Sequence, residues 1–426
     1  MATSQKTIDF ITDQMNNQFG IIVIGGGPSG MMAAGRAAER GRRVLLLEKN
    51  KHLGAKLALT GNGRCNITNA QEDQRLLLGA YGKEGKFLFS PFSQFGMKDT
   101  FSFFAARGLP LVVEEDFRAF PKSQKATDVI RVMQEYMQRG QVVIKTGVNV
   151  HGLISGQGIV RGVNVGGKII EADAVVLATG GTSHPETGST GDGWRWLAKL
   201  GHTIHRASPT VVPLAVREKW VKSLAGVSLN DVKISFFLNS QREFSLAGRI
   251  LCTHFGLSGP LILNAAGKVS ELLRAGPVTA AIDVYPKLDA GNLDTFCTKL
   301  FDNNKNKALK NMMKQLTPVG TAEAIMSLLP RVLPEKKVHS ISRDERKALV
   351  RLLKALPLSI SGLMGNEWAV VADGGLPVGE VEGKTMRSRR YSNLFVTGDL
   401  LHITRPSGGY SLQLCWTTGY VAGSHA

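Results

Sequence analysis

IIVIGGGPSGMMAAGRAAERGRRVLLLEK, residues 21–49, is the stretch that decides the fold of this chain. It begins with an apolar strand, Ile21–Ile24, and passes through a glycine-rich turn into a helix of small residues, Met31–Arg40. A second apolar strand, Arg43–Leu47, follows directly. This strand–helix–strand order is that of a βαβ dinucleotide-binding unit, so we expect an α/β, Rossmann-type domain.

The glycines of the turn have separate roles in such a unit. Gly25 makes the tight turn, Gly27 lets the backbone approach a pyrophosphate, and Gly30 lets the helix pack closely on the strand. Pro28 and Ser29 open the helix, whose free N–H groups face the phosphates. We therefore expect all five residues to contact a dinucleotide.

Glu48 ends the second strand, 23 residues after Gly25. A carboxylate at this position binds both hydroxyls of an adenosine ribose, which argues against a 2′-phosphate there. It does not separate NAD from FAD. Lys49, the next residue, is expected at the same site.

The C-terminal region favours FAD. Residues 394–399 read LFVTGD, an apolar strand that ends in Gly398 and Asp399, and a small-residue helix covers 407–423. In FAD enzymes with this layout the late carboxylate lies on the ribitol, and the following helix N-terminus points at the isoalloxazine. Further residues expected to contact FAD here are Gly408, Gly409 and Tyr410.

Two internal segments complete the expected cofactor site. Residues 51–69, rich in Gly and Asn, should form a loop around the flavin and not a regular element. The second segment follows a buried strand, Ala174–Ala178, and its His184, Ser189, Thr190 and Asp192 suit either the flavin, its nicotinamide reductant or plain turn structure. The cofactor contacts expected in the two segments are Lys56, Gly61, Gly63, Arg64, Asn66, Ala178, Thr179 and Gly180.

Composition limits the classes of protein. The chain has 426 residues, and its 52 basic and 34 acidic residues give a net charge of +18. Such a field attracts polyanions. No apolar run reaches the ~18–20 residues of a membrane span. The four cysteines are far apart and form no CxxC, so we expect no metal site and a cytoplasmic protein.

Changes in residue pattern along the sequence divide the chain into expected domains. We expect a polar extension over 1–20, a discontinuous FAD-binding domain over 21–207 and 368–426, and an inserted domain over 208–367. Within the insertion, 208–285 alternates apolar and polar residues and should be β-rich, while 293–356 should be helical with a basic face. A second glycine-rich nucleotide motif is absent, which argues against a separate NAD(P)H domain.

Four motifs resemble one flavoprotein family. They are GNGRCNITN (61–69), GGTSHPETGSTGDG (180–193), THFGLSGP (253–260) and TGD…RPSGGYSLQ (397–413). The family is that of the NAD(P)/FAD-dependent oxidoreductases that include ribosomal-RNA dihydrouridine synthases and a bile-acid 4,6-reductase. The resemblance implies FAD in a Rossmann-type domain, an inserted β-rich and helical domain, and reduction of a carbon–carbon double bond with NADH or NADPH as electron donor.

The resemblance directs attention to catalytic candidates. In a uracil reduction an acid must protonate C5, and the Cys65 thiol beside Arg64 is one candidate because a nearby cation tunes a thiol pKa. Cys65 suits loop packing equally well, and Arg64 suits a phosphate or carbonyl contact. His254 is a second possible acid or hydrogen-bond donor. Arg405 is expected to stabilise negative charge on the reduced flavin or on a uracil carbonyl.

The basic run of the insertion is the candidate RNA surface. Residues 305–354 hold 12 basic and 4 acidic residues, without interleaved aromatics. A solvated helix face usually alternates charge signs, so we expect this run to bind phosphates and not to stack bases. The expected RNA contacts are Lys305, Lys307, Lys310, Lys314, Lys336, Lys337, Arg343, Arg346, Lys347 and Arg351.

The family and the charge together favour one function. We expect a cytoplasmic FAD-dependent reductase that converts a uridine of large-subunit ribosomal RNA to dihydrouridine, with no membrane or metal partner. Reduction of a small enone or steroid-like molecule is the alternative enzyme. A non-catalytic RNA-binding flavoprotein is the alternative from another class.

Overall fold

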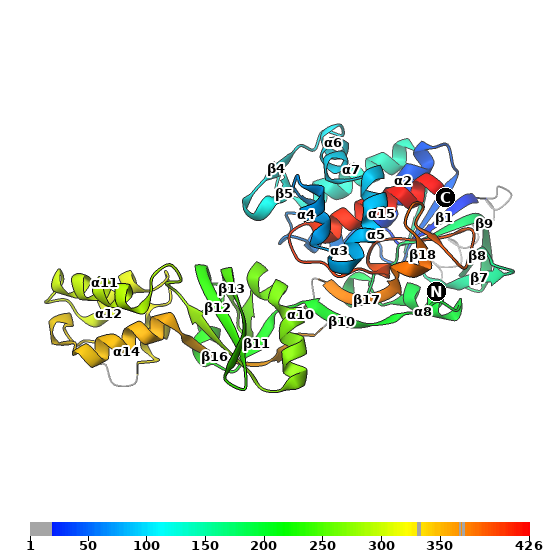
Figure 1. Cartoon of the computed structure of the whole chain (residues 1–426). Helices are drawn as coiled ribbons and strands as arrows, with labels where there is room; N and C mark the ends of the chain where they lie inside the picture. Colours follow the sequence, from blue (N-terminus) through cyan, green and yellow to red (C-terminus); the bar gives the residue numbers. More distant parts are fainter. Residues whose placement is uncertain (1–18, 330–333, 366–367, 369–370) are drawn as a thin grey trace. The chain divides into compact units, whose positions relative to one another are not determined.

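The computed structural model describes residues 19–329, 334–365, 368 and 371–426. The chain folds into two compact units. Figure 1 colours the chain along its sequence. The first unit is formed by Met1–Ser208 and Val371–Ala426, and the second by Pro209–Val370. Of the polar extension expected over 1–20, only Phe19 and Gly20 are described, and they open the first strand.

A mixed sheet with a parallel centre forms the core of the first unit, and β18, β19 and β20 pair antiparallel at one edge. Its strand order is β18-β19-β20-β9-β1-β2-β6, and β1 pairs in parallel with both β2 and β9. Strands β1 and β2 and the carboxyl end of β9 are apolar and almost wholly buried, as expected of strands covered on both faces. The strands are β1 (Phe19–Ile24), β2 (Val44–Glu48), β6 (Val143–Thr146), β9 (Lys168–Leu177), β18 (Val381–Glu382), β19 (Arg387–Ser388) and β20 (Leu394–Val396).

Long helices cover this sheet. Helix α2 (Pro28–Glu39) packs along α15 (Tyr410–His425) and against α7 (Ala126–Arg139). The first two approach each other closely: a Cβ added at Gly419 would lie 2.4 Å from the carbonyl oxygen of Ser29. Residues from the two ends of the chain therefore share one core.

Shorter elements surround this core. They are α3 (Ala55–Leu59), α4 (Gln74–Gly79), α5 (Gly85–Gln94), α6 (Met97–Ala105) and α8 (Asp192–Lys199). Strands β7 (Val150–Gly156) and β8 (Ile159–Val165) form an antiparallel meander with β9. Two small sheets have the orders β3-β5-β4 and β10-β17-β21. Their strands are β3 (Thr68–Asn69), β4 (Leu111–Val113), β5 (Arg118–Pro121), β10 (His205–Val211), β17 (Val371–Pro377) and β21 (Leu401–His402).

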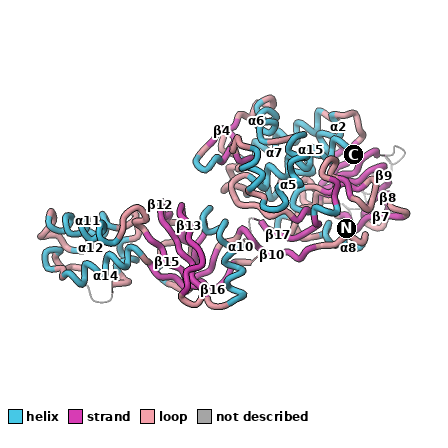
Figure 2. The backbone as a smooth tube through the Cα atoms, viewed as in Figure 1, coloured by secondary structure: helices cyan, strands magenta, loops and turns pink. Residues whose placement is uncertain are grey.

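The second unit combines a closed antiparallel barrel with helices (Figure 2). The barrel order is β11-β14-β13-β12-β15-β16, and it has its own apolar core. The strands are β11 (Leu214–Val216), β12 (Ser228–Leu238), β13 (Gln241–Cys252), β14 (Gly256–Ser258), β15 (Val278–Asp283) and β16 (Leu356–Leu363). The helices are α9 (Lys219–Lys222), α10 (Pro260–Ala275), α11 (Ala290–Asp302), α12 (Leu309–Leu316), α13 (Ala322–Met326) and α14 (Arg343–Lys354).

The structure confirms the expected fold class and corrects details. Residues 51–69 are not wholly irregular, because α3 and β3 lie within them. The β-rich part of the insertion also contains α10, a 16-residue helix. Among the helices of the described residues, none is both long and apolar enough to cross a bilayer.

Candidate cofactor and active site

The glycine-rich turn has the geometry that a pyrophosphate requires. Gly25 has a φ of +107°, and a Cβ added at Gly30 would lie 1.9 Å from the Gly25 carbonyl oxygen, so side chains are excluded at both positions. Gly27, by contrast, has open space around the position of a Cβ. It is the N-cap of α2, and no side chain caps the helix, so the first N–H groups remain available to an anion.

Glu48 lies beside this turn, at the carboxyl end of β2. Its Oε2 accepts a hydrogen bond from the Gly26 N–H at 2.6 Å, and its Oε1 accepts one from the Asn50 N–H at 2.7 Å. The side chain is buried. Since each carboxylate oxygen can accept a second hydrogen bond, the oriented carboxylate still has acceptor capacity for ribose hydroxyls.

The N-terminal turn and the C-terminal motif meet in space. A Cβ added at Gly398 would lie 2.8 Å from Ser29 Oγ, at the start of α2. The Gly398 N–H donates to Thr418 Oγ1 of α15 at 3.0 Å. The two motifs that the sequence separates by more than 350 residues therefore border one site.

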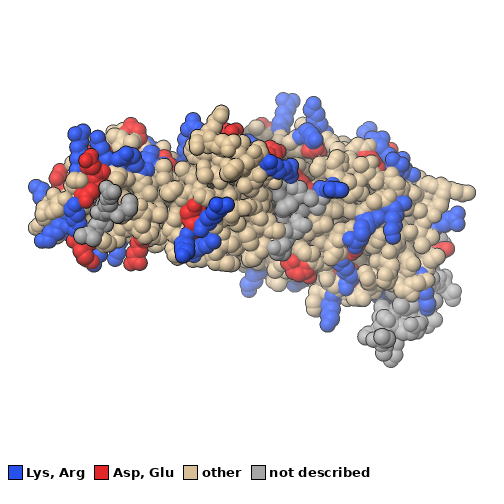
Figure 3. Space-filling view, turned by 90° about the horizontal axis from the view of Figure 1, so that it is seen from below, with Lys and Arg blue, Asp and Glu red and all other residues tan. Residues whose placement is uncertain are grey.

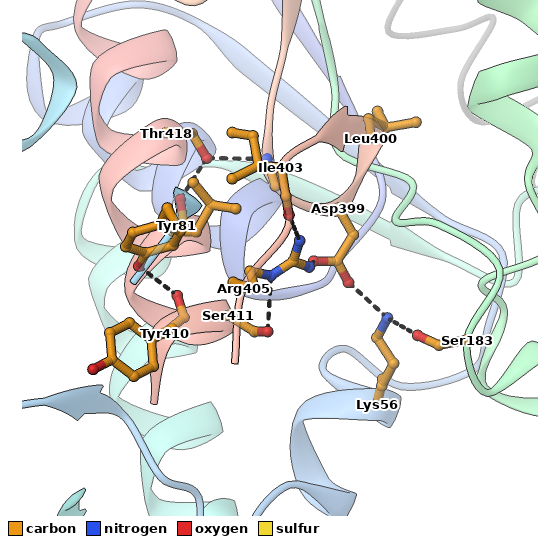
Figure 4. A network of polar contacts seen from close by, with 12 residues as sticks. Lys56, Tyr81, Ser183, Asp399, Leu400, Ile403, Arg405, Tyr410, Ser411 and Thr418 are labelled. Atoms are coloured by element: carbon orange, nitrogen blue, oxygen red, sulfur yellow. Dashed lines mark hydrogen bonds and ion pairs between the residues drawn. The ribbon is translucent and has the colours of Figure 1, made fainter. Parts of the chain in front are cut away.

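A buried polar network surrounds Asp399 (Figure 4). Lys56 Nζ of α3 lies 3.0 Å from Asp399 Oδ2 and 3.2 Å from Ser183 Oγ. The Arg405 guanidinium forms an ion pair with Asp399 Oδ1. Burial acts to raise the pKa of Asp399, but the charges of Lys56 and Arg405 outweigh it and hold the pKa at about 2. Asp399 is therefore ionised at neutral pH.

Arg405 is held from several sides. Only 2% of its side chain is exposed. Besides Asp399, it donates to the Ile403 carbonyl oxygen at 2.7 Å and to Ser411 Oγ at 2.9 Å. These bonds fix the turn before α15. They give Arg405 a positioning role, and its expected contact with flavin or substrate stays a prediction.

The N-terminus of α15 packs tightly on β3. Gly409 has a φ of +98°, and a Cβ there would lie 2.3 Å from the carbonyl carbon of Thr68. Asn69 Nδ2 donates to the Gly408 carbonyl oxygen at 3.1 Å. The Tyr81 hydroxyl donates to the Tyr410 carbonyl oxygen at 2.9 Å. No side chain caps this helix, so its N–H groups are available to an electron-rich group.

The structure corrects the reasoning for Cys65. Its thiol is fully buried, and burial raises its pKa to about 12, although a hydrogen bond with Thr60 acts in the opposite direction. Arg64 is not among the groups that shift the pKa of this thiol, so the expected tuning by a nearby cation finds no support. A thiol without exposed surface offers no contact to a substrate, which favours packing over proton donation.

The Arg64 guanidinium contacts Glu114, Gln124 and Phe120. Its Nη1 lies 3.0 Å from Glu114 Oε1 and donates to Gln124 Oε1 at 3.0 Å. Its guanidinium carbon lies 4.1 Å from the centre of the Phe120 ring. Arg64 thus ties the 61–66 loop to β5 and to residues on both sides of it.

The loop after β9 is tied to the end of β2. Lys49 Nζ lies 2.7 Å from both Thr190 Oγ1 and Asp192 Oδ2. Burial acts to raise the pKa of Asp192, but the bond from Lys49 prevails and lowers it. His184 Nδ1 lies 2.8 Å from Glu186 Oε1, and Ser189 is buried. These contacts indicate a structural role for the loop.

Orphaned polar atoms test whether this region suits FAD. Asn66 Oδ1, Thr179 Oγ1 and Thr182 Oγ1 are buried without a hydrogen-bond partner. They come from the segments in which cofactor contacts were expected, and buried polar atoms of this kind ordinarily have a partner. Together with the open Gly27 and the oriented Glu48, they fit a polar dinucleotide, so the residues present suit FAD.

His254 belongs to the second unit, in the turn between β13 and β14. It is exposed, and its ring packs edge-on against Phe255 and Trp368, with centroids 4.9 and 6.2 Å away. This aromatic environment neither orients the ring with a carboxylate nor assigns it a proton. Its catalytic role stays a prediction.

The candidate RNA surface is partly neutralised. Lys310 pairs with Glu335, Lys336 with Glu345, and Arg346 with Asp294. Figure 3 shows basic and acidic side chains interspersed over the helical part of the second unit, at the left of the view. No ion pair within 4.0 Å is found, among the described residues, for Lys305, Lys307, Lys314, Lys337, Arg343, Lys347 and Arg351.

Some residues of the site were not singled out from the sequence. Ser183 and Asn69 lie inside two of the quoted motifs, so their motifs carried a signal that their own residue types did not. No group of three metal-ligating side chains occurs in the part of the chain that the structure describes.

Comparison with known proteins decides the family. The model of the HI0933-like protein Rossmann domain matches residues 19–425. The chain belongs to the HI0933-like Rossmann flavoprotein family. This confirms the resemblance seen in the four motifs, and it identifies the first unit as a Rossmann-like FAD-binding domain.

Relatives within this family have two kinds of name. A 3-dehydro-bile acid delta(4,6)-reductase of Clostridium scindens is 31% identical over 96% of this chain and 99% of its own length. A ribosomal RNA dihydrouridine synthase of Escherichia coli is 25% identical over 95% of this chain and 96% of its own length.

A solved structure supports the fold alone. The 3-ketosteroid delta1-dehydrogenase from Sterolibacterium denitrificans superposes with a TM-score of 0.55 at 14% identity, over 96% of this chain and 99% of that one. Family membership makes this chain an FAD-dependent oxidoreductase.

Proposed function

We propose that this protein is an NAD(P)H-dependent reductase that converts a uridine of large-subunit ribosomal RNA to dihydrouridine. We choose RNA as the substrate because exposed basic side chains outnumber acidic ones on the helical part of the second unit. Arg343, Lys347 and Arg351 lie four residues apart on α14 and share one face of the helix. A stripe of unpaired cations on a chain of net charge +18 fits a phosphate backbone.

A second basic cluster lies on two adjacent segments. The Val338 N–H donates to the Lys307 carbonyl oxygen at 3.0 Å, and Ala308 forms a β-bridge with Lys337. Lys305, Lys307 and Lys337 are exposed. The surface therefore offers unpaired cations at more than one place, which suits a polyanion better than a small uncharged substrate.

The first unit supplies the residues for the chemistry. The Gly25–Gly30 turn and the α2 N-terminus would hold the pyrophosphate of FAD, Glu48 the ribose, and Asp399 the ribitol. When bound, FAD supplies a hydride to a carbon–carbon double bond conjugated with a carbonyl. Lys56 and Arg405 fix the ionised Asp399, and the free N–H groups of α15 would polarise a carbonyl or flavin oxygen.

A small enone is the second candidate substrate. The 31% identity with the 3-dehydro-bile acid delta(4,6)-reductase exceeds the 25% identity with the dihydrouridine synthase. Three of the ten residues expected to contact RNA are also neutralised by ion pairs. The two candidates share the reduction of a conjugated double bond and differ in what surrounds it.

One experiment separates them. The purified holoenzyme is supplied with NADH or NADPH and, in parallel reactions without oxygen, with unmodified large-subunit ribosomal RNA or a 3-oxo-4-ene steroid. We expect dihydrouridine, detected by mass spectrometry of RNA digests, and little steroid reduction. Fast reduction of the steroid, together with no dihydrouridine in the RNA reaction, would establish the second candidate. If neither substrate oxidises the reduced flavin, the non-catalytic RNA-binding flavoprotein becomes the favoured alternative.

A further inference from the structure

Phe117 is an exposed aromatic residue of the first unit. Its exposed fraction is 52%, and it belongs to neither hydrophobic core of the described residues. Phe89 of α5 is similarly exposed, at 46%, but lies within a regular helix. An isolated exposed side chain is ordinary on a protein surface, so exposure alone assigns nothing to Phe117.

The backbone of Phe117 is unusual. Asp116 and Phe117 both adopt left-handed conformations, with φ of +58° and +57°. Aspartate tolerates this region, but a bulky aromatic residue rarely does, and such residues persist where the surrounding structure holds them. Here the Ala70 N–H donates to the Phe117 carbonyl oxygen at 2.7 Å.

The same support joins this segment to the candidate active site. Asn69 Nδ2 donates both to the Asp116 carbonyl oxygen at 3.2 Å and to the Gly408 carbonyl oxygen at 3.1 Å. One amide group therefore bridges the Phe117 segment to the turn that begins α15. On the other side, Arg64 of the 61–66 loop pairs with Glu114 at 3.0 Å.

Through the Asn69 amide, these contacts join the backbone beside a half-exposed aromatic ring to the turn expected at the isoalloxazine. We propose that Phe117 is a substrate-contacting residue, whose ring stacks on the uracil base presented for reduction. The inference rests on the proposed function, because it names the contact by which the site would hold the base. It adds to the basic surface, which grips phosphates and does not recognise a base.

The shape of the contact favours a nucleobase. A flat pyrimidine that has left its stack can recover stacking on one aromatic face. A steroid-like molecule needs walls that enclose most of its surface. One half-exposed ring on a strained turn supplies a single face and no enclosure.

The test compares a base-bearing RNA with an abasic one. The FAD-loaded protein is titrated, at fixed moderate salt, into fluorescein-labelled decauridylate and into an abasic ribose-phosphate decamer of the same charge, and anisotropy reports binding. Wild type should prefer decauridylate. Phe117→Ala should weaken decauridylate binding about tenfold, the scale of a lost base–aromatic stack, and should leave the abasic decamer unchanged.

Matched variants complete the test. Phe117→Tyr and Phe117→Trp should restore binding, and Phe89→Ala should match wild type. Equal FAD absorbance and equal melting temperatures show that the variants are folded and loaded. Equal affinity of wild type for the two decamers, or Phe117→Ala binding within twofold of wild type, would overturn the inference.

A separate assay distinguishes this inference from the proposed function. If wild type makes dihydrouridine in ribosomal RNA while Phe117→Ala does so equally well, only the stacking role is wrong. If wild type fails to reduce uridine, the proposed function fails. If Phe117→Ala loses steroid reduction but keeps decauridylate binding, the ring contacts a small enone and base stacking is wrong.

Discussion

The two units use charge in opposite ways. In the first, Lys56, Asp399 and Arg405 form a largely buried cluster in which both carboxylate oxygens meet a cation. In the second, pairs such as Lys310–Glu335 are exposed, and other basic side chains have no acidic partner within 4.0 Å among the residues that the structure describes. Loss of one partner from a buried cluster costs much free energy, and the cluster has one geometry. Exposed charges contribute little individually, so only their combined field has a large effect.

This contrast separates positioning from attraction. The first unit holds a few charged groups in fixed positions at the expected cofactor site, and the second presents exposed charge, which under the proposed function a polyanion would neutralise. Substitutions in the first unit should therefore have large, local effects on cofactor binding and stability. Those in the second should have smaller effects that depend on salt.

The largest effect is expected for Asp399→Asn. It leaves Lys56 and Arg405 without their shared carboxylate, and breaking a buried pair typically costs about 3–5 kcal/mol. We expect a lower melting temperature and at least a tenfold loss of FAD retention, measured by flavin absorbance after desalting. Asp294→Asn in the second unit is the control and should keep FAD. Full FAD retention by Asp399→Asn would contradict the expected ribitol contact.

A second carboxylate of the first unit, Glu380, predicts acid sensitivity. Burial acts to raise its pKa, but hydrogen bonds from His202 and the Thr203 N–H hold it at about 2, below the ordinary 4.5. A lowered folded-state pKa stabilises the protein above pH ~4.5, and this stabilisation is lost as the pH falls towards 2.

Glu380→Gln should lack this dependence. Denaturant unfolding at neutral pH should show the variant less stable than wild type, with the difference shrinking between pH ~4.5 and 2. Asp294→Asn, which removes the more exposed pair with Arg346, should cost no more than ~1 kcal/mol. A difference for Glu380→Gln that stays constant over this range would show that the carboxylate charge is not what stabilises the fold.

Charge reversal tests the second unit. Replacing Arg343, Lys347 and Arg351 with Glu should weaken ribosomal RNA binding about tenfold at moderate salt. Each lost phosphate contact should reduce the log–log salt slope by about 0.7 on single strands. The control is a triple variant of the first unit, which changes the net charge by the same amount at exposed positions. Its substitutions are Lys83→Glu, Lys86→Glu and Lys98→Glu. Equal losses in the two triple variants would assign RNA attraction to net charge alone.

The smallest effect is expected for Cys65→Ala. A buried thiol that only packs should cost about 1 kcal/mol of stability on truncation and leave reduction rates within about threefold of wild type. Stopped-flow measurement of flavin oxidation by substrate checks this. A loss of ~10²-fold with intact FAD would restore the thiol as the proton donor.

Local patterns predicted much of the fold. Helix α7 covers 126–139, where Val129, Val132, Met133 and Tyr136 recur at helical spacing and are buried, so the local pattern alone specifies this helix. Helix α10 was missed although Leu261, Ile262, Ala265 and Ala266 follow the same spacing after a proline. The broad alternation around this segment concealed the helix.

The site was predictable only where one motif contained it. Gly25, Glu48 and Asp399 belong to local patterns with known geometry. The pairing of Lys56 with Asp399 joins residues 343 positions apart, and no sequence period reports such a contact. For the same reason the pairing of Arg346 with Asp294, which removes a cation from the basic surface, could not be anticipated.

The barrel closes where the chain enters and leaves the second unit. The Met364 N–H donates to the Pro213 carbonyl oxygen at 3.0 Å, beside the pairing of β11 with β16. Some 150 residues thus depart and return through neighbouring positions, a separation that a short hairpin turn spans. Such a unit is exchangeable: excision with a turn at this point would leave the continuity of the flavin-binding chain intact, and transplantation onto a relative would move the charged surface as one piece. If the charged surface selects the substrate, as proposed, exchange of this unit would change the substrate without alteration of the flavin-binding core.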